Sequence, residues 1–281
     1  MSTSVSTPTA TPARTIPRAT ASALIGRAVK DRTQVIGAAS FYMLAIGAVL
    51  GALWIPLRDV FRSLPQSMDD LVKAISGGTD LTTPTGWANA ELLSLIAPAA
   101  VIVAAITSAA AASAGEEEKK TLGLTLASPV TRGTFLVSTM VAMVVSVLIV
   151  AICIGVGLEI GNAIGGLGFT LGGMIAVAVH ALVLGVLFGA LSFLVGAATG
   201  NKRVASLVPT LVAILAFAAN TFLPLSKPLA AGQKWSPWYY YIASNPLAHG
   251  VDVGPVLILA GIAIVLAAAA VVVFRRRDLR G

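Results

Sequence analysis

Charge is scarce in this chain, and its scarcity excludes a soluble globular fold. Only 11% of the 281 residues are Asp, Glu, Lys or Arg, whereas 57% are hydrophobic. Soluble domains usually carry about 25% charged and about 45–50% apolar residues. So few charges cannot solvate the exterior of a domain that has this much apolar surface to hide. The composition therefore predicts an all-α integral membrane protein.

Groups for catalysis and metal binding are also scarce. The chain has one cysteine, Cys153, and two histidines, His180 and His249. A single cysteine excludes an intrachain disulfide, and no cluster of His and Cys offers a metal site. There is no plausible Ser/His/Asp set and no phosphate loop of the form G-x-x-x-x-G-K-S/T. We expect a chain that is not an enzyme, holds no cofactor and has no ATP site of its own.

Long apolar runs predict six transmembrane helices. A spanning helix needs about 20 apolar residues. The expected spans are residues 35–57, 92–114, 134–158, 169–198, 204–223 and 255–274. The first 20 residues, rich in Ser, Thr and Pro, are typical of a disordered tail. Residues 21–281 are then a single six-helix membrane domain, and residues 159–168 are a short glycine-rich link after the third span.

The positions of the basic residues predict the orientation. The net charge of +7 does not form a patch interleaved with aromatics, as nucleic-acid binding would need, but sits at the ends of the apolar runs. Basic residues are enriched on the cytoplasmic side of membrane proteins. With both termini inside, five basic residues would face outward: Arg58, Arg62, Lys73, Lys227 and Lys234. The other fourteen would face the cytoplasm: Arg14, Arg18, Arg27, Lys30, Arg32, Lys119, Lys120, Arg132, Lys202, Arg203, Arg275, Arg276, Arg277 and Arg280.

Residues 21–34 precede the first span and have an amphipathic pattern. In residues 21–34, the basic residues Arg27, Lys30 and Arg32 accompany an apolar stripe, which predicts an amphipathic helix on the membrane surface. An extension of the first spanning helix is the alternative.

Glycines also recur four residues apart, as at Gly47 and Gly51, and such pairs let membrane helices approach closely. We expect these glycines to serve packing, either within the chain or at a subunit interface.

Two ionisable residues fall within or at the edge of the expected spans. His180 lies inside the fourth span and Glu159 at the end of the third. Because such residues are costly inside a membrane, contact with substrate or with a proton path is the default hypothesis for both. A histidine satisfied by a neighbouring carbonyl, and a glutamate close to the surface, are the plainer alternatives.

Aromatic residues cluster in the last external segment, at Trp235 and at 238–241. Trp and Tyr suit the headgroup zone, so anchoring at the interface is one interpretation. Pro237, Pro246 and Gly250 would break a continuous helix there. The other interpretation is therefore an outer gate or a short re-entrant segment, which would involve Trp238 and Tyr239.

The segment between the second and third spans, residues 115–133, carries the most specific pattern. Three acids open it, an apolar stripe follows, and Pro129 leads into the next helix. A short helix with a charged end and an apolar face can be held by a soluble partner, although a merely solvated loop is the alternative.

This segment resembles the cytoplasmic loop of ABC-2 type transporter permeases. The matching residues are Thr121, Leu122, Leu126, Pro129, Val130, Thr131 and Arg132, whereas Lys120, Gly123 and Thr125 depart from the pattern. Residues 236–240, 245–247 and 274–278 are similar to later parts of the same family.

The resemblance implies the permease subunit of an ATP-binding cassette exporter in the plasma membrane of a bacterium. Such a subunit would move a hydrophobic or amphipathic substrate, drug-like or lipid-like, out of the cell. A separate ATPase subunit would hydrolyse ATP, and a second permease chain, identical or paralogous, would complete the assembly. The loop between spans two and three would be the coupling helix, and residues 21–34 the connecting helix beside the ATPase. The implied docking residues are Glu116, Glu117, Glu118, Lys119, Thr121, Leu122, Leu126, Pro129 and Arg132.

Two other functions remain open from the sequence. A secondary transporter driven by an ion gradient would need no ATPase and would depend on His180 or Glu159. Inverted repeats typical of that class are not evident in the sequence. A membrane scaffold or assembly factor would use the charged loop to bind another partner.

Overall fold

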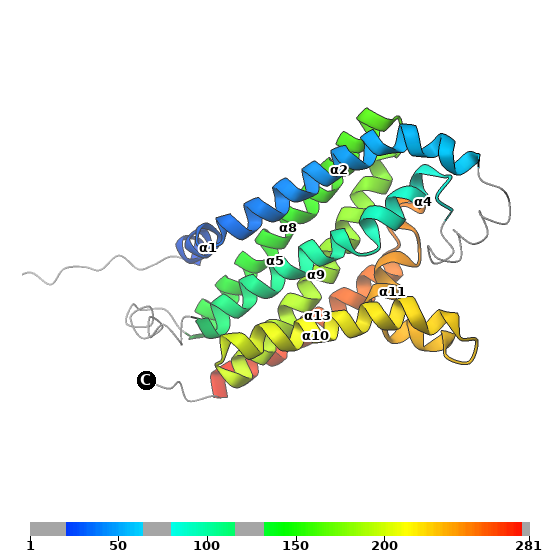
Figure 1. The fold of residues 1–281 in the computed structure, drawn as a ribbon. Helices are drawn as coiled ribbons and strands as arrows, with labels where there is room; N and C mark the ends of the chain where they lie inside the picture. The colour runs from blue at the N-terminus through cyan, green and yellow to red at the C-terminus, as the bar shows by residue number, and fades with distance from the viewer. Residues whose placement is uncertain (1–20, 64–79, 116–131, 277–281) are drawn as a thin grey trace, which may run out of the picture.

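A computed structural model describes residues 21–63, 80–115 and 132–276 of the chain (Figure 1). Within these ranges every regular element is a helix. Six helical segments are long and apolar enough to cross a membrane: Thr33–Val60, Pro84–Ser113, Leu136–Gly165, Leu171–Thr199, Lys202–Leu225 and Val253–Arg276. The predicted all-α membrane fold with six spans is therefore confirmed.

The spans and the short helices between them follow one another along the chain. The α-helices are α1 (Ala21–Lys30), α2 (Thr33–Arg62), α4 (Pro84–Ala88), α5 (Ile96–Ala110), α8 (Arg132–Gly165), α9 (Leu171–Thr199), α10 (Lys202–Phe222), α11 (Pro237–Ile242), α12 (Pro246–His249) and α13 (Val253–Arg276). Two π-helical turns, η1 (Asn89–Leu93) and η2 (Ala111–Gly115), flank α5. Two 3₁₀ turns, η3 (Leu223–Leu225) and η4 (Ala230–Trp235), follow α10.

The third span is longer than predicted. Helix α8 continues to Gly165, so the link to α9 comprises only residues 166–170, and Glu159 lies inside the helix rather than at its end. The link turns at Gly166 and Gly168, whose φ angles of 60° and 73° favour glycine. The other glycines of the expected link remain helical because their neighbours pack tightly, as described below.

Helix α1 is separate from α2, which decides against one continuous first helix. The chain turns at residues 31–32, and the Thr33 hydroxyl donates a hydrogen bond of 2.9 Å to the Lys30 carbonyl. Helix α1 contacts α8, so it lies against the bundle at the end where α2 begins.

Five glycines let α2 and α8 pack backbone to backbone. A Cβ on Gly47 would overlap the backbone of Gly157, and a Cβ on Gly51 would overlap that of Gly161. A Cβ on Gly165 would lie only 2.6 Å from the Gly51 carbonyl oxygen. The two helices run side by side in the same direction (Figure 1). These glycine pairs therefore serve packing within the chain.

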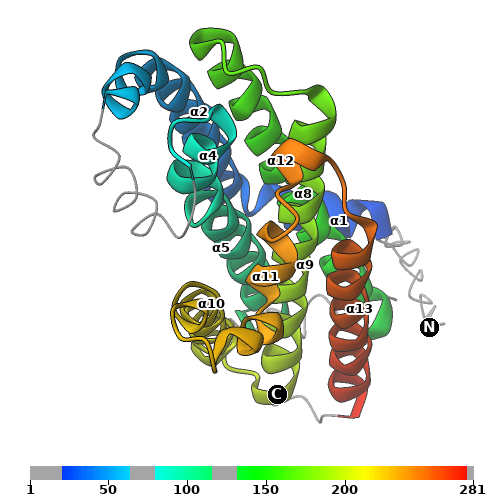
Figure 2. The ribbon, with the colours of Figure 1, turned by 90° about the vertical axis from the view of Figure 1, so that its right-hand side faces the viewer.

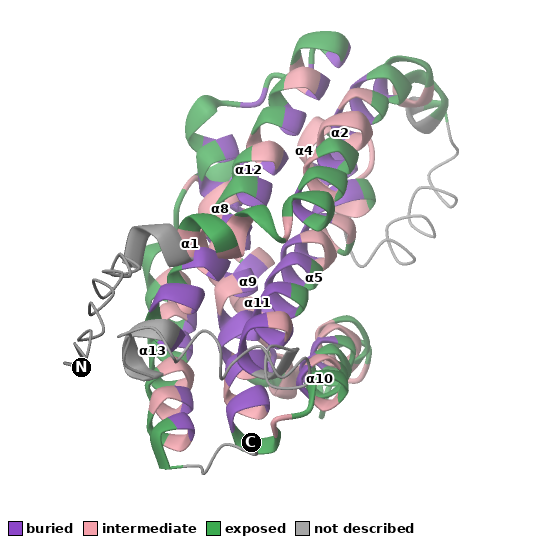
Figure 3. Cartoon of the chain, turned by 90° about the vertical axis from the view of Figure 1, so that its left-hand side faces the viewer, coloured by how far each residue is buried: buried purple, intermediate pink, exposed green. Residues whose placement is uncertain are grey.

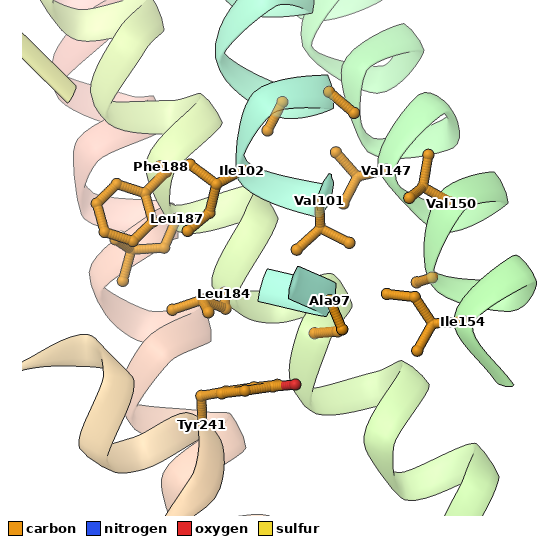
Figure 4. Close-up of a cluster of buried hydrophobic side chains, with 14 of the residues drawn as sticks. Ala97, Val101, Ile102, Val147, Val150, Ile154, Leu184, Leu187, Phe188 and Tyr241 are labelled. Atoms are coloured by element: carbon orange, nitrogen blue, oxygen red, sulfur yellow. The ribbon is translucent and has the colours of Figure 1, made fainter. Parts of the chain in front are cut away.

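Helix α9 is the centre of the bundle, because it contacts α5, α8, α10 and α13. Side chains from three of these helices meet in a buried cluster that includes Val101, Val147 and Leu184 (Figure 4). Gly185 makes this approach possible, since a Cβ there would lie 2.7 Å from Val147 Cγ1 and 3.0 Å from Val101 Cβ.

The outer faces of the bundle are exposed (Figure 3). Many of the large side chains exposed there are apolar. Leu215 on α10 and Ile264 on α13 are examples, at 67% and 68% exposure. A soluble protein rarely exposes apolar faces of this extent, whereas lipid tails cover them in a membrane.

The described charged residues sort between the two ends of the bundle. Helix α1 and the last residues of α13 lie at the same end (Figure 1). Seven basic residues whose side chains are described lie at that end, with Asp31 as the accompanying acid: Arg27, Lys30, Arg32, Lys202, Arg203, Arg275 and Arg276. This distribution agrees with the predicted orientation, in which that end faces the cytoplasm.

The α2–α8 contact generates a prediction. Gly47→Ala should lower the free energy of unfolding by about 1–3 kcal/mol, because its Cβ must displace the backbone of α8. Gly37→Ala, on the same helix but with no atom within 4 Å of the added Cβ, is the matched control and should raise it by up to about 1 kcal/mol, because Ala favours a helix more than Gly does. Denaturation of the purified variants in detergent measures both, and equal stabilities would contradict the backbone contact.

Candidate functional site

The segment between α10 and α13 folds back against the spanning helices instead of staying at the surface. Trp238 and Tyr241 are 3% and 2% exposed, whereas Trp235 is 91% exposed. Helices α11 and α12 both contact α9 (Figure 2). The aromatic cluster is therefore divided. Trp235 is exposed, as an interfacial residue would be, whereas Trp238 and Tyr241 are part of the core.

Hydrogen bonds from Ser236 and Trp238 fix α11 in this position. The Ser236 hydroxyl accepts from the Trp238 backbone N–H at 3.1 Å and donates to the Ala216 carbonyl of α10 at 2.7 Å. The Trp238 indole N–H donates to the Ser94 carbonyl at 2.9 Å. Ser94 lies where the helix is interrupted between η1 and α5. The Ser94 carbonyl at this helix interruption thus finds its partner within the protein.

Aromatic and backbone contacts complete the attachment of the segment. The Trp238 ring centre lies 6.3 Å from that of Phe188 on α9 and 5.6 Å from that of Phe217 on α10. The Asn89 amide of η1 donates to the Asn245 side-chain oxygen at 3.1 Å. Asn245 has a φ of 47°, in the left-handed region, and this reverses the chain between α11 and α12.

His180 lies in the interior of the bundle with one ring nitrogen unsatisfied. The side chain is completely buried on α9, and Nδ1 lies 2.8 Å from the Ala176 carbonyl oxygen. Because a carbonyl only accepts, Nδ1 carries the proton and donates. The other nitrogen, Nε2, is buried with no hydrogen-bond partner. The neighbouring-carbonyl interpretation therefore accounts for one nitrogen and leaves the other available.

Tyr241 carries a second unsatisfied group. Its ring reaches from α11 into the core cluster, with the hydroxyl directed toward Ala97 (Figure 4). The hydroxyl oxygen has no partner, and burial raises the pKa of the Tyr241 phenol above its ordinary value. Tyr241 therefore stays protonated and can donate a hydrogen bond.

Asn89 Oδ1 and Ser244 Oγ are likewise buried without partners. We use the term inner polar site for His180, Tyr241, Ser244 and Asn89. Two of them belong to the α11–α12 segment and two to elements attached to it, α9 and η1. Most buried polar groups in proteins have a partner, so each of these four groups keeps an unused capacity for a hydrogen bond.

Glu159 lies elsewhere. It is an exposed residue of α8, and the Asn162 amide donates a hydrogen bond to its Oε2 at 3.3 Å. His180 is completely buried on α9. The structure therefore gives the two ionisable residues different surroundings, one on the outer face of the bundle and one in its core.

The remaining predicted residues are only partly placed. Tyr239 is half-buried on α11, and its ring meets that of Tyr240 edge-on at 5.3 Å. Arg132 is the first residue of α8. Residues 116–131, which include all the other predicted docking residues, lie outside the described part of the chain. Across the described ranges, no group of three or more His, Cys, Asp or Glu residues could hold a metal ion.

The sequence placed Tyr241 in the aromatic cluster but did not indicate that its hydroxyl would be buried, and it gave no signal for Ser244, Asn89 or Ser94. Ser-Pro at 236 and Asn-Pro at 245 are typical helix-start signals, and they mark the beginnings of α11 and α12. They did not indicate which side chains would be buried, because that depends on how α11 meets α5 and α9.

A family model described as multidrug efflux system permease Rv1217c, C-terminal domain, matches residues 21–275. The match begins with α1 and includes all six spans. A search of curated protein sequences gives no match.

The burial of α11 leads to a prediction about stability. Trp238→Ala should cost about 3–5 kcal/mol of unfolding free energy, because it leaves a cavity between α9 and α10 and removes the donor to Ser94. Trp235→Ala, at the 91%-exposed position, should change it by less than about 0.5 kcal/mol. Chemical denaturation followed by circular dichroism compares the pair, and equal losses would argue against a buried α11.

Proposed function

The chain belongs to the multidrug efflux permease family that this match defines, and from that membership we propose that it is the transmembrane subunit of an ATP-binding cassette exporter of the ABC-2 type. Its substrate is hydrophobic or amphipathic and leaves the cell, and ATP is hydrolysed by a separate subunit. The observation that carries the proposal is the family match over all six spans, together with the acidic, leucine-containing segment between the second and third. The proposed location is the cell membrane of a bacterium.

The position of the coupling segment supports this mechanism. It joins the end of η2 at Gly115 to the start of α8 at Arg132. Helices α5 and α8 both pack against α9, the central helix. A displacement of the segment by an ATPase would therefore act on two helices that contact the same third helix.

Helix α1 supports the same proposal from a second direction. It carries Arg27 and Lys30 in its last turn and contacts α8. A partner bound at this end would touch α1 and the coupling segment together. ATP binding would then favour one of two helix arrangements through contacts that differ between them.

The inner polar site and α11 supply a path and a barrier in this proposal. Trp238 and Tyr241 fill the space between α5, α9 and α10 with aromatic rings. Movement of α11 would open this end of the bundle toward the outside. The unpartnered groups at His180 and Tyr241 would then hydrogen-bond polar parts of a passing substrate.

Pairing with a second permease chain is part of the proposal. Helices α2, α10 and α13 are the least buried of the six spans, and their outer faces are apolar. One such face would meet the second chain, identical or paralogous, and the others would meet lipid.

An ion-driven secondary transporter is the second candidate, and buried His180 with its free Nε2 is the observation in its favour. It differs from the first candidate in its energy source. A scaffold without transport would fail to move any substrate under either energy source.

The docking segment gives the first test. Glu117→Lys or Leu122→Asp should reduce transport by tenfold or more and release the ATPase from the purified chain, because each removes a contact expected at the docking surface. Lys234→Glu, a charge reversal at the opposite end, is the control. Pull-down with mass spectrometry measures association, and an ATPase that stays bound to both variants would contradict this docking site.

The energy source gives the second test. Export from cells should stop when ATP is depleted and continue when an ionophore collapses the proton gradient at constant ATP. His180→Gln keeps a hydrogen-bonding side chain but cannot gain a charge, so it should retain ATP-driven export. Export that ends with the ionophore and with His180→Gln would establish the secondary transporter instead.

A further inference from the structure

A groove runs along the outer face of the bundle between α8 and α9. Its volume is about 420 Å³. Small residues line part of it, namely Ala151, Gly155 and Ala178, and a Cβ added to Gly155 would lie 3.8 Å from Ala178 Cβ. Larger side chains, including Ile152 and Ile175, border it. From Leu148 to Glu159 it follows α8 for about 16 Å, about half the roughly 30 Å thickness of the hydrocarbon core.

Glu159 is the single charged side chain among the residues that line this groove. The other lining residues are apolar. In the described part of the chain the one ion pair is Arg58–Asp59, so Glu159 has no cationic partner there. An exposed carboxylate at the end of an apolar groove is complementary to a ligand with an apolar body and one positive charge.

Glu159 lies near one end of the two spans that form the groove. It stands six residues before the end of the α8 span at Gly165, and it lines the groove together with Leu171, the first residue of the α9 span. Ionisable residues in spanning helices are often functional. A bound cation would pair with this carboxylate, which a neutral acyl chain in the groove would not.

We propose that the groove between α8 and α9 binds an amphipathic cation, with its apolar body against Ile152 and Ile175 and its positive group beside Glu159. This inference rests on the proposed function in so far as it names the substrate class of the exporter. A ligand can enter the groove sideways from the lipid, because the groove lies on the exposed face of two spanning helices.

Binding of rhodamine 6G, a planar apolar cation, tests the proposal without an ATPase. Fluorescence anisotropy would be measured with the full chain in phosphatidylcholine nanodiscs.

Glu159→Gln should weaken binding by about tenfold or more, because it removes the charge from a charge-assisted contact. Glu159→Asp should retain most of the affinity, and Ala178→Phe, which fills the groove, should abolish it. Glu91→Gln, an exposed acid outside the groove, is the matched control and should bind like the wild type.

Several results would overturn the proposal. Wild-type affinity in Glu159→Gln would show that the carboxylate is not used, as for a lipid chain. Disulfide-linked dimers of Ala178→Cys, made with Cys153→Ser, would show that a second copy covers the groove.

Thermal melting of each variant separates loss of the site from loss of the fold. A wild-type chain that holds an ATPase but binds no rhodamine 6G overturns this inference alone, whereas one that binds it but holds no ATPase overturns the proposed function alone.

Discussion

Backbone contact between helices is the constraint on which the rest of this structure depends. In lipid, apolar side chains gain little by leaving the solvent, so helices associate through close packing. Gly47 and Gly51 bring α2 onto α8, and Gly185 brings α9 onto α5 and α8. Helix α9 can then contact four spans at once, and the short helices α11 and α12 rest on it.

The α11–α12 segment packs on α9 under the same constraint. Its backbone is interrupted at Asn245, and membrane interiors tolerate such interruptions only where partners are at hand. Ser236, Trp238 and Asn89 supply bonds that hold it. These bonds leave the Tyr241 hydroxyl without a partner, and His180 Nε2 on α9 is also buried without one.

The two ionisable residues illustrate how helix packing assigns different chemistry to similar positions. His180 and Glu159 both lie within spans, on neighbouring helices. One is completely buried and the other is exposed in a groove. The inner polar site offers hydrogen bonds, whereas the groove offers one negative charge beside an apolar surface. In the proposed exporter, these would be a path through the bundle and an entry from the lipid.

The sequence alone determined the membrane fold, the six spans and the sorting of charge, because each depends only on local hydropathy and on charge along the chain. It also indicated close packing at Gly47 and Gly51, but not that their partners are Gly157 and Gly161. Only the tertiary structure decided that α8 passes through Glu159 to Gly165, that Trp238 is buried while Trp235 is not, and that Tyr241 joins His180 among the unpaired groups. The physical reason is that burial and partner choice depend on contacts between residues far apart in the chain, such as Asn89 and Asn245, which are 156 positions apart. Hydropathy along the chain carries no record of such pairs.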